Sequence, residues 1–234
     1  MIVAVSAIAL VAVIAIANMP QTVAADPNRS PRPIPTFTFS TADEATDLPQ
    51  AMFFGDSYSQ GVGASTQSSR WTTIVSRKHD WDERNEAFGG TGYTATAGLE
   101  GCGRSDCPNY VEAVAAAPDA SPAIVFVAGG QNDFSRWANE PDVVRDAINR
   151  VYADISEKYP DARIIAVGPS IIGPVNDVIL GIDGAVQDAA ERVGADYISL
   201  LEPDVLDESM DIGDGGHVDD AGHRAIADAV LAGL

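Results

Sequence analysis

Residues 123–130, AIVFVAGG, form an uninterrupted apolar run that ends in two glycines. A run of this length without polar alternation is typical of a strand buried on both faces, as in a parallel sheet. Further candidate strands lie at 51–54 (AMFF), 85–88 (NEAF), 163–167 (RIIAV) and 196–200 (DYISL). We expect all of these segments to belong to one sheet.

Helices are predicted between the strands, at about 68–79, 109–117, 141–158, 178–193 and 219–231. Strands that alternate with helices indicate a parallel sheet covered by helices on both faces. The predicted fold class is therefore α/β, a three-layer α/β/α sandwich with a five-stranded parallel sheet. In such sheets, ligands bind at the carboxyl ends of the strands.

The composition is that of a globular domain and excludes some partners. Of 234 residues, 46% are hydrophobic and 21% are charged, and the formal net charge is −20. This charge argues against a nucleic-acid partner, because binding to phosphates depends on Lys and Arg. It argues more mildly against anionic membrane surfaces and highly anionic substrates.

The N-terminal segment is predicted to lie outside the folded domain. Residues 2–17 are apolar apart from Ser6, which suits a secretory signal over 1–25 with cleavage after Ala25. No Lys or Arg precedes this run, which departs from the usual pattern of a signal. An uncleaved membrane anchor is the alternative. Residues 26–49 contain five prolines among polar residues and predict an extended linker, which leaves 50–234 as the domain. Both alternatives place the domain outside the cytoplasm, secreted or tethered.

The two cysteines, Cys102 and Cys107, lie in the segment CGRSDC. In an exported protein such a pair indicates a local disulfide. Because the loop that it closes is short, its contribution to stability is expected to be modest. A catalytic or metal-binding thiol is the weaker alternative, since the sequence has no second cysteine pair.

Four short motifs follow predicted strands or precede the last helix. They are GDSYSQG at 55–61, NEAFGGTG at 85–92, GQND at 130–133 and DGGH at 214–217. In this order, and over about residues 51–234, they resemble the SGNH (GDSL-like) hydrolase superfamily. The resemblance implies the flavodoxin-like SGNH hydrolase fold and a serine hydrolase that acts on carboxylic esters.

The resemblance assigns Ser57 as the nucleophile, His217 as the base and Asp214 as the residue that orients the base. A serine hydroxyl is a poor nucleophile until a base takes its proton. An acid three residues before a histidine can hold one ring nitrogen while the other faces the serine. Asp220 and His223 repeat this spacing, but His223 lies inside the predicted last helix, so the pair at 214 and 217 is preferred.

The resemblance also implies an oxyanion hole made by the backbone N–H groups of Ser57 and Gly90 and the side-chain amide of Asn132. Such donors stabilise the negative charge of an acyl-transfer intermediate. Plain turn roles are the alternative for Gly90 and Asn132. The adjacent Asp56 and Asp133 are expected to hold their loops by hydrogen bonding.

One position departs from the GDSL form of the motif. Tyr58 stands where that form has an aliphatic residue, and it places a bulky ring beside the predicted nucleophile. Phe134, Arg136 and Trp137 follow the third motif as candidate pocket residues, with packing on the surface as the alternative.

No metal or cofactor is predicted. The His and Asp side chains of residues 217–223 could be drawn as a ligand cluster, but the triad and the helix start explain them better. The sequence contains no GxxxxGK[ST] phosphate loop and no complete dinucleotide fingerprint.

The predicted function is an exported serine esterase that cleaves short-chain or acetyl esters of small molecules or carbohydrates through an acyl-Ser57 intermediate. The absence of a long insertion that would form a lipase lid favours short acyl chains. A cell-envelope carbohydrate O-acyltransferase with the same site, or an inactive surface binding module, are the alternatives. Because His217 must be neutral to accept a proton, activity is expected to fall as pH drops through about 6 to 7.

Overall fold

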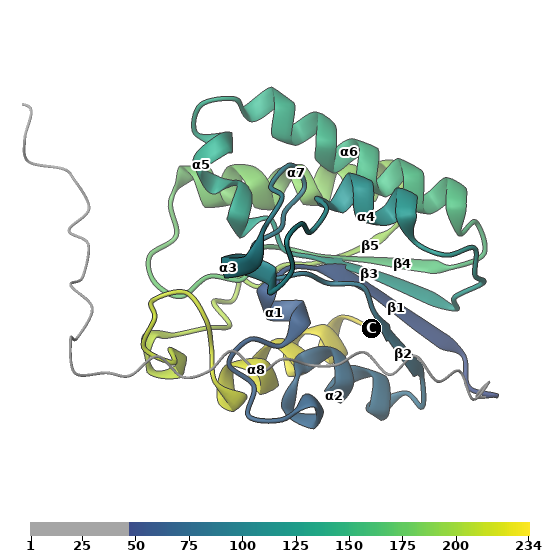
Figure 1. Ribbon diagram of the computed structural model, residues 1–234, viewed down its shortest axis with the longest axis horizontal. Coiled ribbons are helices and arrows are strands. Elements are labelled where there is room, and N and C mark those ends of the chain that lie inside the picture. Colours follow the sequence, from purple (N-terminus) through teal and green to yellow (C-terminus); the bar gives the residue numbers. More distant parts are fainter. Residues whose placement is uncertain (1–46) are drawn as a thin grey trace, which may run out of the picture. The chain divides into compact units, whose positions relative to one another are not determined.

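The computed structural model of the protein describes residues 47–234 (Figure 1). The predicted signal or anchor at 1–25 lies outside the described residues, as does most of the predicted linker at 26–49. These limits stay predictions. Among the helices of residues 47–234, none combines the length and apolarity that a membrane span needs.

Five parallel strands form one sheet in the order β2-β1-β3-β4-β5. The strands are β1 (Gln50–Gly55), β2 (Asp82–Asn85), β3 (Ile124–Ala128), β4 (Arg163–Val167) and β5 (Asp196–Ile198). This order is that of flavodoxin-like doubly wound folds, in which the chain moves outward from β1 in both directions. The predicted α/β class and five-stranded parallel sheet are confirmed.

Helices cover both faces of the sheet, which makes three layers (Figure 1). Above the sheet in Figure 1 lie α4 (Tyr110–Ala116), α6 (Pro141–Lys158) and α7 (Asp177–Val193), and below it lie α2 (Trp71–Lys78) and α8 (Asp220–Gly233). The remaining helices are short: α1 (Ser57–Gln60), α3 (Leu99–Cys102), α5 (Phe134–Trp137), and the 3₁₀ turns η1 (Gln67–Ser69), η2 (Gln131–Asp133) and η3 (Glu208–Met210).

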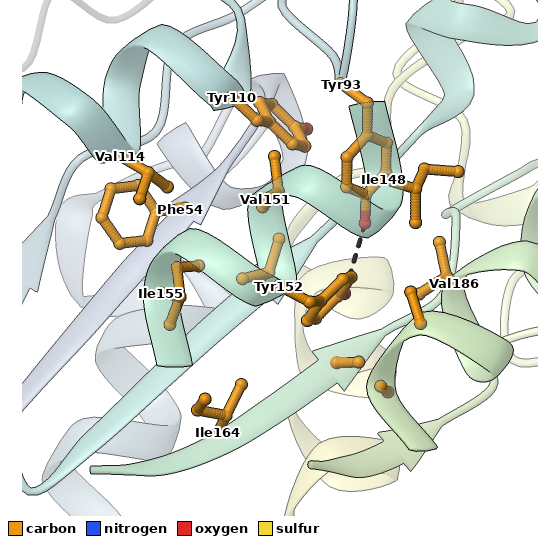
Figure 2. Packing of buried hydrophobic residues seen from close by; sticks show 14 of the residues in the cluster. Phe54, Tyr93, Tyr110, Val114, Ile148, Val151, Tyr152, Ile155, Ile164 and Val186 are labelled. Atoms are coloured by element: carbon orange, nitrogen blue, oxygen red, sulfur yellow. Dashed lines mark hydrogen bonds between the residues drawn. The ribbon is translucent and has the colours of Figure 1, made fainter. Parts of the chain in front are cut away.

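The strand alternation divides the core into two clusters. In β1, Met52 and Phe54 pack under α4 and α6, whereas Ala51 and Phe53 pack against α2 and α8. Figure 2 shows the first cluster, in which Phe54 lies beside Val114 and aliphatic side chains of α6 fill the space above the sheet. Both faces of the sheet are therefore apolar, as the continuous hydrophobic strands predict.

Capping side chains set the ends of the longer helices. Asn109 and Glu112 form a reciprocal capping box at the start of α4, and Asn176 caps α7 through the N–H groups of its first turn. Asp219 caps α8 in the same way. Gly194 ends α7 in a left-handed conformation. The boundaries therefore follow from local polar residues and agree closely with the predicted ranges.

The predicted second strand, 85–88, is wrong in its boundaries. The observed β2 covers Asp82–Asn85, whose polar side chains are all half-buried. β2 is an edge strand with β1 as its neighbour in the sheet, so it needs no apolar run. Residues 86 and 88 still donate backbone hydrogen bonds to β1, at 2.8 and 3.0 Å. The predicted segment is thus the exit from the strand. Two smaller differences are that β5 ends at Ile198 and that the first long helix begins at Trp71.

Candidate functional site

The turn after β1 places Ser57 at the carboxyl edge of the sheet. Asp56 caps α1, and its Oδ1 accepts the Tyr58 N–H at 2.9 Å. Ser57 is therefore the first residue of α1, and the first N–H groups of a helix have no partner within it. Ser57 is buried, with a residual exposure of 7%, and it lines the adjoining pocket.

Asp214 and His217 form a compact unit in the loop before α8. His217 Nδ1 lies 2.7 Å from Asp214 Oδ2, while Asp214 Oδ1 accepts the N–H groups of Gly216 and His217, each at 2.9 Å. Burial of Asp214 raises its pKa, but the hydrogen bonds from His217 and Gly216 outweigh burial and leave the pKa below its ordinary value. The carboxylate therefore stays ionised, and it fixes the imidazole by its Nδ1 side.

A pocket of about 310 Å³ brings the separate motifs together. Ser57, Asn132 and His217 line it, although they come from three distant parts of the chain. Asp214 stands behind His217 and does not line the pocket. Within residues 47–234 no hydrogen bond joins Ser57 Oγ to His217, and such bonds are often long until substrate binds.

The predicted oxyanion donors lie on two adjacent loops. Asn132 Nδ2 donates one hydrogen bond to the Thr91 carbonyl at 2.8 Å, and a primary amide has a second hydrogen. Gly90 has a φ of 75°, a conformation that glycine adopts without strain. No hydrogen bond joins its N–H to another residue of the described part. Gly90 does not line the pocket itself but lies next to Thr91, and Asn132 is bonded to that residue.

Asp56 is a buried carboxyl group beside the nucleophile. Complete burial raises its pKa to about 7, and hydrogen bonds from the Tyr58 N–H and the Tyr110 hydroxyl oppose that rise. The Tyr110 hydroxyl donates to Asp56 Oδ2 at 3.1 Å. Asp56 thus ties α1 to α4, in agreement with its predicted role of holding a loop.

The competing pair, Asp220 and His223, lies outside the pocket that contains Ser57. His223 is fully buried, and its Nε2 lies 3.1 Å from the Val62 carbonyl. Burial lowers the pKa of its imidazole and so favours the neutral ring. Because a carbonyl oxygen can only accept, the proton of that ring lies on Nε2. Asp220 accepts the N–H and the hydroxyl of Ser65, at 2.7 and 2.6 Å. Neither residue lines the pocket that contains Ser57.

The sequence matches the GDSL-like Lipase/Acylhydrolase family over residues 53–225. The chain belongs to this family. The matched region begins in β1 and ends in α8, so it contains all four motifs and the whole pocket. The predicted SGNH (GDSL-like) superfamily and the predicted class of enzyme, a carboxylic ester hydrolase, are confirmed.

Solved structures of other proteins share the fold at low sequence identity. TesA has a TM-score of 0.60 at 20% identity, with 79% of this chain and 97% of TesA covered. An active-site mutant of a family two carbohydrate esterase from Clostridium thermocellum has a TM-score of 0.63 at 17% identity, with 79% of this chain and 63% of the esterase covered. A family two carbohydrate esterase from Cellvibrio japonicus has a TM-score of 0.62 at 17% identity, with 80% of this chain and 61% of the esterase covered.

The chain spans less than two thirds of these two esterases. Another structure of the Clostridium thermocellum esterase is a complex with cellohexaose. No curated protein matches the sequence.

One wall of the pocket was missed by reasoning from the sequence. It is formed by Ser170, Ile171 and Ile172, in the loop that follows β4. The available signal was their position directly after a predicted strand, since ligands bind at the carboxyl ends of parallel strands. Tyr58, Gln131 and the backbone of residues 215–216 complete the lining.

The three candidate pocket residues after β3 have different environments in the structure. Phe134 lines the pocket. Trp137 is buried against α6 and α7, and the Arg145 guanidinium lies 5.0 Å from its ring centroid. Arg136 forms an exposed ion pair with Glu140. Packing is thus the role of Trp137, and Phe134 alone among the three reaches the site.

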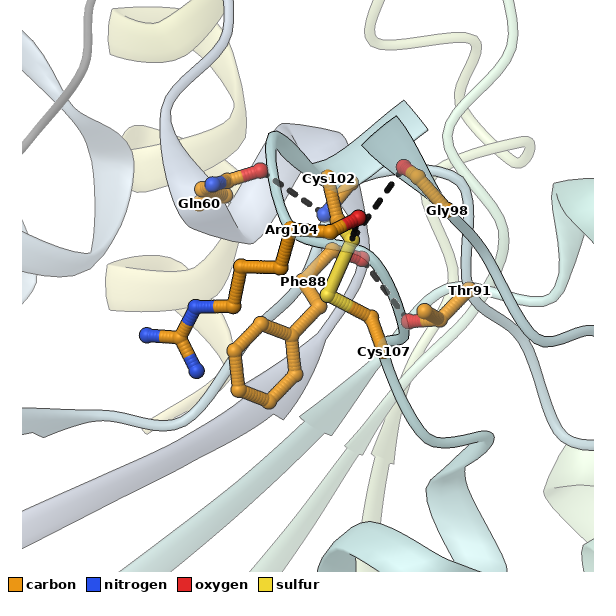
Figure 3. Close-up of a disulfide and its surroundings, with 8 residues drawn as sticks. Gln60, Phe88, Thr91, Gly98, Cys102, Arg104 and Cys107 are labelled. Carbon is orange, nitrogen blue, oxygen red and sulfur yellow. Dashed lines mark hydrogen bonds between the residues drawn. A yellow bond between two sulfur atoms is a disulfide. The ribbon is translucent and has the colours of Figure 1, made fainter. Parts of the chain in front are cut away.

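Cys102 and Cys107 are joined by a disulfide in the structure (Figure 3). Helix α3, which ends at Cys102, packs against the turn at Gly89, where an added Cβ would lie 2.5 Å from the Gly101 carbonyl oxygen. From the other side, Gln60 Oε1 accepts the Gly89 N–H at 2.7 Å (Figure 3). The turn that carries Gly90 is therefore held between α1 and α3, the helix that contains Cys102.

Proposed function

We propose that the protein is an exported serine esterase that hydrolyses short-chain carboxylic esters through an acyl-Ser57 intermediate. The observation that supports this most is the common pocket, which Ser57, His217 and Asn132 line together. Behind it, Asp214 holds His217 at 2.7 Å. Each group required for acyl transfer is thus present at one site.

In the first step, Ser57 Oγ attacks the carbonyl carbon of the ester and its proton passes to His217 Nε2. Asp214 accepts a hydrogen bond from Nδ1–H, so it selects the tautomer whose Nε2 is free to take the proton. Because the pKa of Asp214 is lowered, the carboxylate stays ionised and stabilises the imidazolium as it forms.

The carbonyl oxygen becomes negative in the tetrahedral intermediate. We assign its stabilisation to the backbone N–H groups of Ser57 and Gly90 and to the second amide hydrogen of Asn132. Asn132 is suited to this role because its other hydrogen is already fixed on the Thr91 carbonyl. The donor is therefore oriented before the substrate arrives.

Collapse of the intermediate breaks the ester C–O bond, and the alcohol leaves with the proton from His217 Nε2. A water molecule then attacks the acyl carbon while His217 takes its proton. Release of the carboxylic acid returns the proton to Ser57 Oγ. The sequence of steps consumes one ester and one water and leaves Ser57, His217 and Asp214 unchanged.

The substrate proposed is a neutral small-molecule or carbohydrate ester with a short acyl group. A pocket of about 310 Å³ with Phe134, Ile171 and Ile172 on its wall has room for a short apolar acyl chain. The net charge of −20 disfavours highly anionic esters. The carbohydrate esterases that share the fold, one of them in complex with cellohexaose, support an acylated carbohydrate.

Export is part of the proposal and rests on two features. The apolar run at 2–17 suits a secretory signal. The disulfide between Cys102 and Cys107 is a bond that persists in oxidising compartments. Expression in a bacterial host followed by N-terminal sequencing of the exported protein tests this. An N-terminus at Asp26 is expected for a cleaved signal, whereas an intact N-terminus in the membrane fraction identifies an anchor.

The activity is tested by hydrolysis of p-nitrophenyl acetate, butyrate and octanoate. Ser57→Ala and His217→Ala are each expected to lower kcat by at least about 10³-fold. His223→Gln is the matched control. His223 also follows an aspartate by three residues, and the glutamine amide keeps a hydrogen-bond donor toward the Val62 carbonyl. Its kcat is expected to stay within about threefold of the wild type.

Other outcomes identify other functions. If His217→Ala stays active and His223→Gln is inert, His223 is the base. Cleavage that transfers the acyl group to an added sugar, and not to water, identifies a carbohydrate O-acyltransferase. A folded protein that cleaves none of the esters but binds sugar is a binding module, and esterase activity is then excluded.

A further inference from the structure

The peptide unit between Gly216 and His217 is held by hydrogen bonds at both its carbonyl and its N–H group. Its carbonyl, on Gly216, accepts a hydrogen bond from the Tyr58 hydroxyl at 2.7 Å. Its N–H, on His217, donates to Asp214 Oδ1 at 2.9 Å. Because a peptide unit is planar and rigid, these two bonds together fix the backbone that carries the His217 side chain.

Tyr58 is itself firmly placed. Its backbone N–H donates to Asp56 Oδ1, and its side chain has an exposure of 4%. Its ring centroid lies 5.8 Å from that of His217, with the planes tilted by 39°. Burial raises the pKa of the Tyr58 phenol far above its ordinary value, so the hydroxyl remains a donor at every pH the enzyme meets.

The loop that carries His217 is otherwise held mainly by its own residues. Asp211 Oδ1 accepts the N–H groups of Gly213 and Gly215, at 2.7 and 3.2 Å, and Asp211 bridges to Val218. These bonds shape the loop but do not connect it to the nucleophile. The Tyr58 bond spans 158 positions of sequence and joins α1 directly to the loop. Three glycines make the loop conformationally permissive, so an external bond matters here.

We propose that Tyr58 is a positioning residue, whose hydroxyl sets the geometry between Ser57 and His217 by holding the Gly216 carbonyl. Tyr58 acts through His217 and needs no contact with the reacting atoms. The aliphatic residue of the GDSL form lacks a hydroxyl and cannot make this bond. The inference rests on the proposed function, because its readout is ester hydrolysis that depends on Ser57.

The test begins with Tyr58→Phe, which keeps the ring and removes the hydroxyl. Tyr58 lines the pocket, and Phe keeps the ring that does so. We expect kcat for p-nitrophenyl acetate to fall about tenfold with KM unchanged, because only the hydroxyl that orients His217 through Gly216 is lost. Tyr58→Leu restores the residue of the GDSL form, and we expect an equal or larger fall in kcat. Unfolding midpoints of both variants show that the protein measured is folded.

Tyr159→Phe is the matched control. The Tyr159 hydroxyl also donates to a backbone carbonyl, that of Pro118, at 3.0 Å, and the side chain has an exposure of 2%. Tyr159 does not line the pocket. This variant therefore loses a bond of the same type, and kcat is expected to stay within about twofold of the wild type.

A second readout separates positioning from a general structural effect. In the Asp214→Asn variant the His217 ring is no longer held correctly. Adding Tyr58→Phe to that variant should therefore lower its kcat by a further factor of less than about two. Equal losses from Tyr58→Phe in both backgrounds, accompanied by a lowered unfolding midpoint, overturn the inference.

The proposed function and this inference fail in different ways. If Ser57→Ala is inert and Tyr58→Phe keeps the wild-type kcat, the inference is overturned and the esterase stands. If Ser57→Ala remains active, the proposed function fails whatever Tyr58→Phe does. A tenfold fall in Tyr58→Phe that disappears in the Asp214→Asn background supports both.

Discussion

The Asp133 carboxylate accepts the backbone N–H of Tyr93 at 2.7 Å, and this bond joins the turn after β3 to the loop after β2. The same carboxylate accepts the N–H and the hydroxyl of Thr94, at 2.9 and 2.7 Å. Its neighbour Asn132 donates to Thr91 in the same loop. The two loops that carry the proposed oxyanion donors are therefore fixed relative to each other by the buried Asp133 and by Asn132.

Asp133→Asn tests this connection. The amide replaces one acceptor oxygen by an NH₂ group, which must then face backbone N–H donors. We expect the free energy of unfolding to fall by about 2–3 kcal/mol, because a buried donor is left unsatisfied, and kcat to fall with it. Urea denaturation and p-nitrophenyl acetate hydrolysis measure the two effects. Asp142→Asn, in an exposed ion pair with Arg145, is the control and should change stability by less than about 1 kcal/mol.

Asp56 predicts a pH dependence of stability with a definite sign. Its pKa is about 7 in the folded protein against an ordinary value of 3.8. Below pH 3.8 the carboxyl is protonated in both states and has no effect on stability. As pH rises toward about 7, only the unfolded chain releases the proton, so the folded state loses stability. Above that pH the penalty is constant, and its size is on the order of 4 kcal/mol.

The measurement compares the wild type with Asp56→Asn, which has no proton to release. Urea midpoints are determined for both proteins between pH 4 and pH 8. We expect the wild-type stability minus that of the variant to decline with rising pH, because the contributions of groups that do not interact with Asp56 cancel in the difference. A difference that does not vary with pH shows that Asp56 is ionised throughout.

Much of the fold could be predicted because its signals are local. The Val- and Ile-rich runs mark buried strands, and the bounds of β4 and α6 agree with the predicted ones. The edge strand β2 could not be placed in this way, since its side chains are polar and half-buried. An edge strand is recognised by the neighbour that it pairs with, and the sequence does not display that neighbour.

The site, like the fold, has some residues that local sequence patterns mark and others that they do not. Ser57, Asn132 and His217 belong to motifs that can be recognised one by one, and the structure brings them to one pocket. Ile171 and Ile172 carry no motif, and isoleucine in a loop signals nothing about function. The bond between Tyr58 and Gly216 depends on a contact between residues 158 positions apart. No local pattern in the sequence predicts such a contact.

The disulfide predicts a modest sensitivity to reduction. It closes a loop with a sequence separation of five residues, and constraint of so short a loop in the unfolded chain contributes about 2 kcal/mol. Cys102→Ala/Cys107→Ala should therefore lower the free energy of unfolding by about that amount. Urea denaturation with and without reductant checks it. The wild type is expected to lose stability on reduction and the double variant to show no change; equal midpoints for the wild type in both conditions contradict the prediction.

The wall formed by the loop after β4 should determine acyl-chain length. Ile171 lines the pocket, is half-buried and belongs to neither core cluster, so shortening it enlarges the pocket with little effect on the core. Ile171→Ala is expected to raise the ratio of kcat/KM for p-nitrophenyl octanoate over acetate about tenfold, since a few methylene groups gain room.

Val175→Ala is the control for this substitution. Val175 lies in the same loop and is exposed outside the pocket, so the ratio should not change. If Ile171→Ala also leaves the ratio unchanged, the acyl group lies against another part of the lining. Phe134, which directly follows the motif at the end of β3, is then the residue to shorten, because its large apolar side chain also lines the pocket.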